Sequence, residues 1–409
     1  MSVPGWLQQR LEAVGGTVPF STYMDWVLHD PLHGAYGSGR LRIGPAGDFA
    51  TAPSLGPDFA ALLAPQLADW LGELATAGPG PLAVVETGPG EGSLAADLAA
   101  ELVAGWPALA RRCELVLVEP NPGMAERQRQ RLAGCALPCR WSSFAALTAT
   151  PLRGVLLAHE VLDALPVERI SWDGAGWRRQ QVALTAAPES SEPASSPPAG
   201  AALALSWGEP LTAELRALLE PLQARGLLGP DRERQPGWCS ELHAAVGPWL
   251  QEAAGALSAG TLLVIDYALE ARSYYAPQRS AGTLIAYRAQ RASGDPLLEP
   301  GACDLTAHLC IDSLQEAAAA AGWQPLGHCR QGQALLALGL AERLHGLQGL
   351  QAGALAEALG RREALLRLVD PHALGDFRWL AFARGSCGQG GSGGPPLPSP
   401  RFLREPDGA

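Results

Sequence analysis

A short apolar strand that runs into a glycine-rich turn and then a helix constrains this chain more than any other stretch. Residues 82–85 are all apolar and follow a Gly/Pro segment, which is typical of a short buried strand. Glu86 closes the strand, and Gly88, Gly90 and Gly92 follow at alternate positions. Leucines then recur at every fourth position, which predicts a helix. This order of elements indicates a ligand site at the carboxyl edge of a parallel sheet.

The spacing of the glycines separates two classes of adenosine-containing ligand. The dinucleotide fingerprint GxGxxG needs its third glycine one residue later than Gly92. The pattern ExGxGxG, from Glu86 to Gly92, instead resembles motif I of class I S-adenosylmethionine (SAM) methyltransferases. Glycines let the backbone approach a ligand closely, and the helix that follows offers free N–H groups. The alternative is an ordinary tight turn between a strand and a helix.

Composition excludes several classes of protein. The net charge of −11 and the pI near 5.3 argue against nucleic acid as a partner. All 30 basic residues are arginine, which excludes a P-loop and a Schiff-base lysine. The eight cysteines form no CxxC pair, so we expect no metal site and reduced thiols. No apolar run reaches the ~18–20 residues of a membrane span, and the N-terminus does not resemble a signal peptide. We therefore expect a soluble, cytoplasmic protein.

Acidic and polar residues follow the next two predicted strands. Residues 113–118 form an apolar stretch that ends at Glu119, whose carboxylate can accept hydrogen bonds from both ribose hydroxyls of an adenosine. The same geometry would serve NAD, so Glu119 does not discriminate between cofactors. Ser142 lies in a third predicted strand at 137–144, and the resemblance to class I methyltransferases implies that it contacts the adenine; helix capping is the alternative.

A second acidic site follows the buried strand predicted at 155–158. His159 and Glu160 end this strand, and Asp163 comes three residues after Glu160, so both acids face one side if the turn is helical. Two carboxylates beside a sulfonium can orient a guanidinium or an amine nucleophile. We therefore predict that Glu160 and Asp163 are catalytic. The alternative is that they cap the next helix.

Four separated segments carry motifs, namely ExGxGxG, PFSTYMDWVLHDPLHGAYGSG with GDFATAP, HEVLDALP, and TLIAY with DLTAH. Together these motifs resemble the MidA family of SAM-dependent methyltransferases, which is related to the mitochondrial complex I assembly arginine methyltransferase. Two positions depart from the family pattern, since His159 occupies a position where Asn is usual and Ile285 replaces a common Arg.

The resemblance implies a fold, a cofactor and a substrate class. It implies an α/β fold with a Rossmann-like core, a mostly parallel seven-stranded sheet with helices on both faces, an N-terminal helical and loop cap and an inserted subdomain. The implied cofactor is SAM, and the loops that contain Asp48 and Thr51 are implied to contact cofactor or substrate. The implied reaction is arginine methylation of a complex I-type, NADH dehydrogenase-like subunit. The alternative is an assembly or docking protein that binds SAM without turnover. A nicotinamide dehydrogenase fits poorly because of the glycine spacing, and the oligomeric state stays open, a homodimer included.

Other segments complete the predicted organisation. We expect an amphipathic helix at 239–257, with Glu241 and His243 on its solvated face, and a final antiparallel strand pair at 323–344. His308 invites a general-base role, although a structural role in a turn is the commoner one.

The predicted parts are an N-terminal cap (1–78), a SAM-binding core (79–170 and 258–340), an insertion (171–257) with a disordered linker near 188–202, a C-terminal helical closure (341–384) and a disordered tail (385–409).

Overall fold

The computed structural model describes residues 3–45, 47–186, 201–228, 234–347, 355–385 and 399–404. The chain divides into two compact units. The N-terminal unit contains Met1–Arg42, Asp163–Val246 and Leu269–Leu314, and the sheet unit contains Ile43–Leu162, Gly247–Ala268 and Gln315–Ala409. This division differs from the predicted boundaries, because the segment at 269–314 joins the N-terminal residues rather than the sheet. Most of the linker predicted at 188–202 lies outside the described residues.

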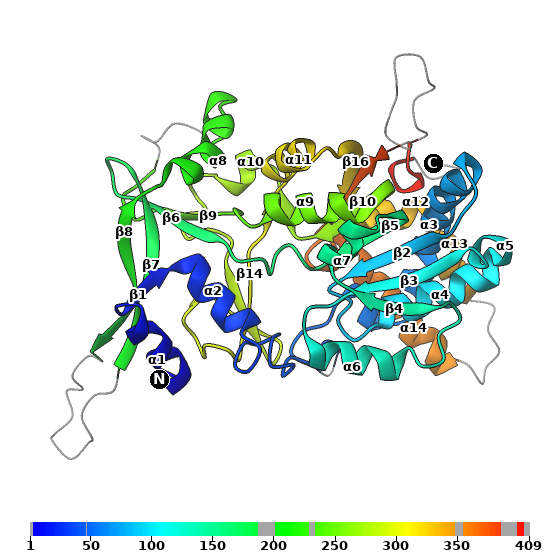
Figure 1. Cartoon of the computed structure of the whole chain (residues 1–409), viewed down its shortest axis with the longest axis horizontal. Coiled ribbons are helices and arrows are strands. Elements are labelled where there is room, and N and C mark those ends of the chain that lie inside the picture. Colours follow the sequence, from blue (N-terminus) through cyan, green and yellow to red (C-terminus); the bar gives the residue numbers. More distant parts are fainter. Residues whose placement is uncertain are drawn as a thin grey trace. The chain divides into compact units, whose positions relative to one another are not determined.

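The sheet unit is built on a seven-stranded sheet with the strand order β16-β17-β10-β5-β2-β3-β4 (Figure 1). The five strands from β10 to β4 are parallel, and β17 runs antiparallel to both of its neighbours. The predicted fold class, a mostly parallel seven-stranded sheet, is therefore confirmed. The strands are β2 (Leu82–Thr87), β3 (Cys113–Val118), β4 (Cys139–Ser142), β5 (Leu152–His159), β10 (Leu257–Asp266), β16 (Gln324–Arg330) and β17 (Arg378–Arg384).

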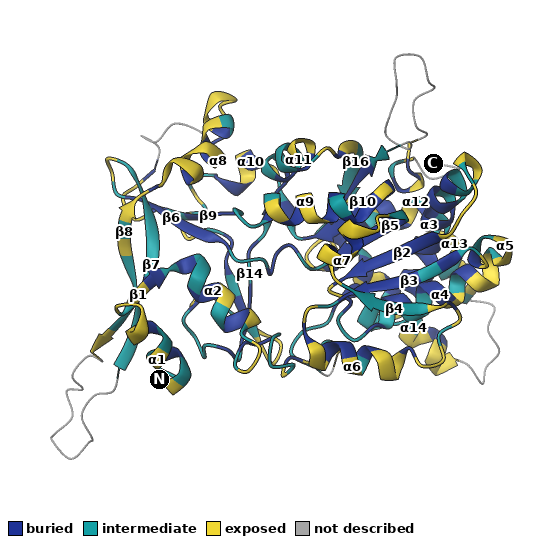
Figure 2. Cartoon of the chain, viewed as in Figure 1, coloured by how far each residue is buried: buried dark blue, intermediate teal, exposed yellow. Residues whose placement is uncertain are grey.

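The central strands are apolar on both faces, as parallel strands covered on both sides must be. Every residue of β2 is buried, and Figure 2 shows β2, β3 and β5 as buried along most of their length. Leu82 and Val84 belong to a large core with α3 and α4, whereas the alternate residues Ala83 and Val85 are buried on the opposite face. This arrangement brings the carboxyl ends of β2, β3 and β5 to one edge of the sheet.

Helices of the sheet unit follow the predicted pattern where their apolar residues repeat. The leucines after the glycine turn are buried on α4, as expected. The helices are α3 (Asp58–Ala77), α4 (Ser93–Gly105), α5 (Pro107–Ala110), α6 (Pro122–Arg131), α7 (Phe144–Ala149), α9 (Val246–Ala256), α12 (Gln331–Ala337), α13 (Leu340–Gly346) and α14 (Leu355–Val369), with short 3-10 helices η1 (Ala52–Leu55), η5 (Leu374–Asp376) and η7 (Arg401–Leu403). Helix α11 (Ile311–Ala320) begins in the N-terminal unit and ends in the sheet unit.

The C-terminal part of the chain corrects two predictions. Residues 323–344 do not form a strand pair, because β16 is followed by α12 and α13 and pairs with the much later β17. The segment predicted as a helical closure therefore supplies an inner strand of the sheet. Part of the predicted disordered tail is also ordered. Phe402 is 1% exposed and packs against Trp70 and Trp379.

The N-terminal unit contains a five-stranded antiparallel sheet and a small three-stranded sheet. A hairpin turn joins β6 and β7, and Asp173 in this turn accepts hydrogen bonds from the backbone N–H groups of Ala175 and Gly176. The elements are α1 (Gly5–Ala13), β1 (Thr17–Pro19), α2 (Phe20–His29), β6 (Glu168–Trp172), β7 (Trp177–Ala186), β8 (Ala201–Pro210), α8 (Ala213–Ala224), β9 (Cys239–Leu242), α10 (Ala271–Tyr274), β12 (Ile285–Arg288), β13 (Arg291–Ser293) and β14 (Asp304–Thr306), and β11 (Ala268–Leu269) pairs with β15 (Leu309–Cys310).

The helix predicted at 239–257 is wrong in its first part. Residues 239–242 form strand β9, which pairs with β6, and the helix α9 begins at Val246. Glu241 and His243 therefore do not lie on a solvated helix face, and Glu241 is 0% exposed. A strand of four residues is too short to show an alternating pattern, so the apolar residues of α9 dominated the prediction.

Candidate active site

The glycine turn after β2 adopts a conformation that side chains disfavour. Gly88, Gly90 and Gly92 all have positive φ, at 57°, 54° and 78°. A Cβ on Gly88 would lie 2.9 Å from Val161 Cγ2, and a Cβ on Gly90 would lie 2.9 Å from Ile43 Cδ1. Glycine is therefore required here both by the backbone and by the close approach of two other segments. The turn leads directly into the N-terminus of α4.

Glu86 lies at the end of β2, directly before this turn. Its side chain is buried, and burial raises its pKa to about 8, although a hydrogen bond from the Ala95 backbone acts in the opposite direction. An acid of this kind is largely protonated at neutral pH unless a cation lies beside it. This behaviour fits a site where a cationic ligand group would restore the charge of the carboxylate.

Glu119 follows β3 and is held by a glutamine that the sequence analysis missed. Gln128 on α6 donates from Nε2 to Glu119 Oε2 (3.0 Å) and to Gly90 O (2.9 Å), and its Oε1 accepts from Trp141 Nε1 (2.9 Å). The Asn121 N–H donates to Glu119 Oε1 (2.8 Å). Burial raises the pKa of Glu119, and these hydrogen bonds oppose that shift. Each carboxylate oxygen keeps a second lone pair for a ligand hydroxyl.

The other predicted cofactor contacts lie in the same unit. The loop that contains Asp48 approaches the glycine turn, because Ile43 at its start contacts Gly90 and bridges to Phe49 at its end. Thr51 is buried beside η1, and its backbone N–H donates to Ser54 Oγ (2.9 Å).

Ser142 is half-buried at the end of β4, in register with Val118 on β3. This register places it next to the strand that leads into Glu119. The contacts of Asp48, Thr51 and Ser142 with a cofactor stay predictions.

Glu160 occupies a strained turn at the end of β5. Its φ is +51°, an uncommon value for a residue with a side chain, so the surrounding contacts must enforce it. The Glu160 N–H donates to Ile265 O (2.9 Å), and the Leu162 N–H donates to Asp266 Oδ2 (3.0 Å). Val161 of the same turn contacts Gly88. The turn that carries Glu160 therefore lies directly against the glycine turn.

Asp266 is a second residue that the sequence analysis left without a role. It ends β10, is completely buried, and accepts hydrogen bonds from the backbone N–H groups of Leu162 and Tyr267. Its carboxylate therefore fixes the turn after Glu160. The signal in the sequence was an acid at the end of an apolar strand, the same signal that singled out Glu86 and Glu119.

His159 lies among aromatic side chains. Its ring lies 5.4 Å from that of Phe59 and 6.5 Å from that of Phe377. Burial lowers its pKa to about 3, so the ring is neutral at physiological pH. The His159 Nδ1 atom is 3.5 Å from Glu160 Oε1, a pairing between a neutral ring and a carboxyl group.

Asp163 does not share a helical turn with Glu160, because residues 160–165 form no helix. Glu160 lies in the sheet unit, whereas Asp163 begins the second segment of the N-terminal unit. Asp163 is buried, and its backbone O accepts from the Ala307 N–H (3.0 Å). The joint action of the two acids stays a prediction.

Several predicted motifs meet inside the N-terminal unit. The Tyr36 hydroxyl donates to Asp304 Oδ1 (2.9 Å), which joins the loop after α2 to the DLTAH segment. His29 Nε2 lies 3.3 Å from Ala164 O, next to Asp163. His308 is half-buried after β14. Among the described residues, no group of three or more His, Cys, Asp or Glu side chains is arranged to hold a metal ion, and no helix is long and apolar enough to cross a membrane.

Comparisons with known proteins identify a family, two named relatives and a related solved structure. Residues 62–329 match a protein-family model described as "Putative S-adenosyl-L-methionine-dependent methyltransferase". The chain is 27% identical over 401 residues to "Protein arginine methyltransferase NDUFAF7 homolog, mitochondrial" of Drosophila melanogaster, covering 90% of this chain and 82% of the fly protein. It is 31% identical over 187 residues to "Protein arginine methyltransferase NDUFAF7, mitochondrial" of Xenopus tropicalis, so the match spans only 42% of that relative. A COG1565 superfamily member from Burkholderia thailandensis, crystallised with S-adenosyl-homocysteine, is 29% identical with a TM-score of 0.78, covering 94% of this chain and 95% of that one.

Proposed function

Because the chain belongs to this family of S-adenosyl-L-methionine-dependent methyltransferases, we propose that it is a class I enzyme that binds SAM and methylates arginine in a protein substrate. The observation that carries the proposal is the contact between Val161 and Gly88. It puts the turn that carries Glu160 against the glycine turn where the cofactor is expected.

The residues at the carboxyl edge of the sheet fit the cofactor. Gly88, Gly90 and Gly92 leave the backbone free of side chains where a ligand would approach. Glu119 retains lone pairs for ribose hydroxyls. Glu86 supplies a buried carboxylate, and Asp48, Thr51 and Ser142 are proposed to complete the site.

In methyl transfer, the main task of the protein is to align the nucleophile with the methyl group. When bound, SAM supplies an electrophilic methyl group on a sulfonium centre. Holding a nucleophile in line with that centre can lower a barrier by up to ~7–11 kcal/mol. The pKa of a free guanidinium lies far above neutral pH, so its proton leaves during or after attack. Glu160 and Asp163 are the acids proposed to orient the guanidinium and to accept that proton.

The proposal also includes a substrate and a cellular compartment. Two relatives are named protein arginine methyltransferases, which supports arginine as the acceptor. By the family resemblance, the protein partner is a subunit of an NADH dehydrogenase-like, complex I-type assembly. We propose the cytoplasm as the compartment, since the cysteines of the described residues are free thiols, as a reducing environment favours.

Incubation of the purified protein with methyl-labelled SAM and candidate NADH dehydrogenase-like subunits tests the proposal. We expect label on an arginine, and we expect Gly90→Val to abolish it, because a branched side chain cannot occupy that turn. Glu160→Gln should lower transfer by at least about 100-fold without loss of SAM binding. Glu252→Gln, on an exposed part of α9, is the matched control. Absence of transfer to every subunit, with Gly90→Val indistinguishable from the wild type, contradicts the catalytic proposal.

A second candidate is an assembly or docking protein that binds SAM without turnover. Two residues favour it, namely His159, which is neutral and buried where the family usually has Asn, and Ile285, which replaces a common Arg. Calorimetric SAM binding without any methylated product from cell lysate would support this candidate. NAD that fails to raise the melting temperature, while SAM raises it, would exclude a dehydrogenase.

A further inference from the structure

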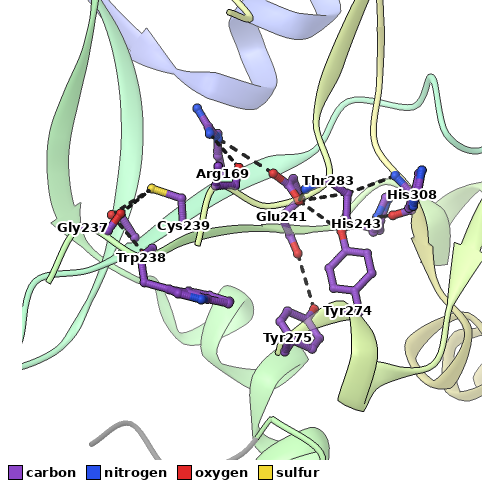
Figure 3. A network of polar contacts seen from close by, with 12 residues as sticks. Arg169, Gly237, Trp238, Cys239, Glu241, His243, Tyr274, Tyr275, Thr283 and His308 are labelled. Carbon is purple, nitrogen blue, oxygen red and sulfur yellow. Dashed lines mark hydrogen bonds and ion pairs between the residues drawn. The ribbon is translucent and has the colours of Figure 1, made fainter. Parts of the chain in front are cut away.

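Glu241 is a buried carboxylate in the N-terminal unit that no role described above uses. Its Oε2 accepts from the Thr283 N–H (2.9 Å) and from Thr283 Oγ1 (3.1 Å), and its Oε1 lies 3.8 Å from Arg169 Nε. Figure 3 shows this carboxylate between Arg169 and Thr283. Burial raises the pKa of Glu241, whereas Arg169 and Thr283 act to lower it. Strands β6 and β9 thus hold one end of a polar network inside the unit.

The backbone beside Glu241 is shaped to receive it. Gly282 has a φ of +78°, and a Cβ on this residue would lie 2.1 Å from Glu241 Oε1. Any other residue at 282 would displace the carboxylate and Thr283 with it. The acid and the glycine, far apart in the sequence, therefore depend on each other.

Thr283 and His243 hold both polar backbone groups of His308. The His308 N–H donates to Thr283 Oγ1 (3.1 Å), and His308 O lies 2.7 Å from His243 Nε2. A carbonyl only accepts, so Nε2 of His243 carries the proton. Burial lowers the pKa of His243 to about 4, which keeps the ring neutral and the donor in place at physiological pH.

The same turn is bonded to the proposed acid. The Ala307 N–H donates to Asp163 O (3.0 Å), one residue before His308. A continuous series of hydrogen bonds thus runs from Glu241 through Thr283 and the 307–308 backbone to Asp163. Glu241 and His243 come from the inserted segment, so this segment reaches the motif residues directly.

We propose that Glu241 and His243 are positioning residues that fix the 307–308 turn, and through it Asp163, for the protein substrate. The inference rests on the proposed function, since Asp163 is one of the acids assigned there. Stability alone is a poor reason to keep such groups, because well-packed apolar residues often replace a buried ionic network without loss. Because this network ends at the backbone of Asp163, its proposed role is to hold that acid in position.

Hydrogen exchange of the free protein tests the positioning directly. His243→Leu removes the donor at nearly constant size, and loss of one hydrogen bond of about 1.4 kcal/mol predicts about tenfold faster exchange at the 307–308 amides. His243→Gln retains an N–H at the Nε2 position and should restore the slow rate. His372→Leu, at an exposed site, is the matched control. Thr283→Val removes the acceptor for the His308 N–H and gives a second test if His243→Leu does not fold.

Kinetics with SAM and the protein substrate give the second readout. For His243→Leu we expect KM for the protein substrate to rise at least about fivefold, with the SAM Kd within about twofold of the wild type and KM restored in His243→Gln. Unchanged exchange at 307–308 in both His243→Leu and Thr283→Val overturns the inference, as does equal weakening of SAM binding. The exchange experiment needs no substrate. A wild-type protein without methyl transfer but with the expected exchange pattern would therefore contradict only the proposed function.

Discussion

Gln128 joins three parts of the expected cofactor site, so its replacement should affect both folding and SAM binding. Its side chain is 0% exposed, with hydrogen bonds to Gly90 O, Glu119 Oε2 and Trp141 Nε1 at 2.9, 3.0 and 2.9 Å. Gln128→Met has a similar volume and removes all three bonds. Two neutral bonds contribute about 1 kcal/mol each, and the bond to the carboxylate contributes about 2 kcal/mol. Since water can reach the half-buried Glu119, we expect the free energy of unfolding to fall by about 2–4 kcal/mol.

Urea unfolding and calorimetric SAM titration measure the two effects of Gln128→Met. The SAM Kd should rise at least about tenfold, because Glu119 and the Gly90 carbonyl lose the donor that orients them. Gln130→Met, an exposed position on the same helix, should leave both quantities within about 0.5 kcal/mol of the wild type. If Gln128→Met unfolds like Gln130→Met and binds SAM with the wild-type Kd, Gln128 does not organise this site.

Four further changes have calculable outcomes. Gly90→Ala places a side chain at φ +54°, so it should lower the free energy of unfolding by about 1–2 kcal/mol and weaken SAM binding. Gly105→Ala, at an unhindered helix position, should cause neither effect. The pKa of Glu86 is about 8 in the folded protein and 4.5 in the unfolded chain. The stabilisation of the folded state by protonated Glu86 is therefore complete below pH 4.5 and is lost as the pH rises to about 8. Between about pH 6 and pH 8 the wild type should therefore lose about 2–3 kcal/mol of unfolding free energy that Glu86→Gln retains, as urea titrations at both pH values would show. Phe402→Ala should cost about 3–5 kcal/mol in the same assay, and a loss below about 1 kcal/mol would mean that this segment is not part of the core. Glu160→Gly relieves a φ of +51° and should raise the melting temperature while it abolishes methyl transfer; retained activity would exclude a catalytic role.

The sequence predicts most reliably the elements that repeat an apolar pattern over several turns. The strand before the glycine turn and the leucines of α4 lie as expected, because burial of one face determines both. The acids at strand ends also lie at the predicted edge, since parallel strands end together. The mostly parallel seven-stranded sheet was implied by the family resemblance, whereas its strand order is given by the structure alone.

Other features depend on contacts between distant segments and leave little local signal. Gln128 lies on a helix with several arginines, and nothing in that pattern shows which side faces the glycine turn. Glu241 lies on a strand of four residues, and its burial requires Arg169, Gly282 and Thr283 from other segments. Phe402 follows a Gly/Pro-rich stretch, where one aromatic residue carries no periodicity. The contacts of these residues come from segments that are distant in the sequence, so a local pattern cannot identify them.

The strained backbone at Glu160 connects the cofactor side of the site with its chemistry. Positive φ for a residue with a side chain costs about 1–3 kcal/mol, and glycine at this position would avoid that cost. The turn is nevertheless enforced by bonds to Ile265 O and to the buried carboxylate of Asp266, whose own burial is a further cost. The positive φ and the buried carboxylate both reduce stability, and both maintain one orientation of this turn. Such costs are expected where the orientation of a side chain matters more than stability. Since the next residue of this turn contacts Gly88, the carboxylate of Glu160 is held at the place where the cofactor and the substrate nitrogen are proposed to meet.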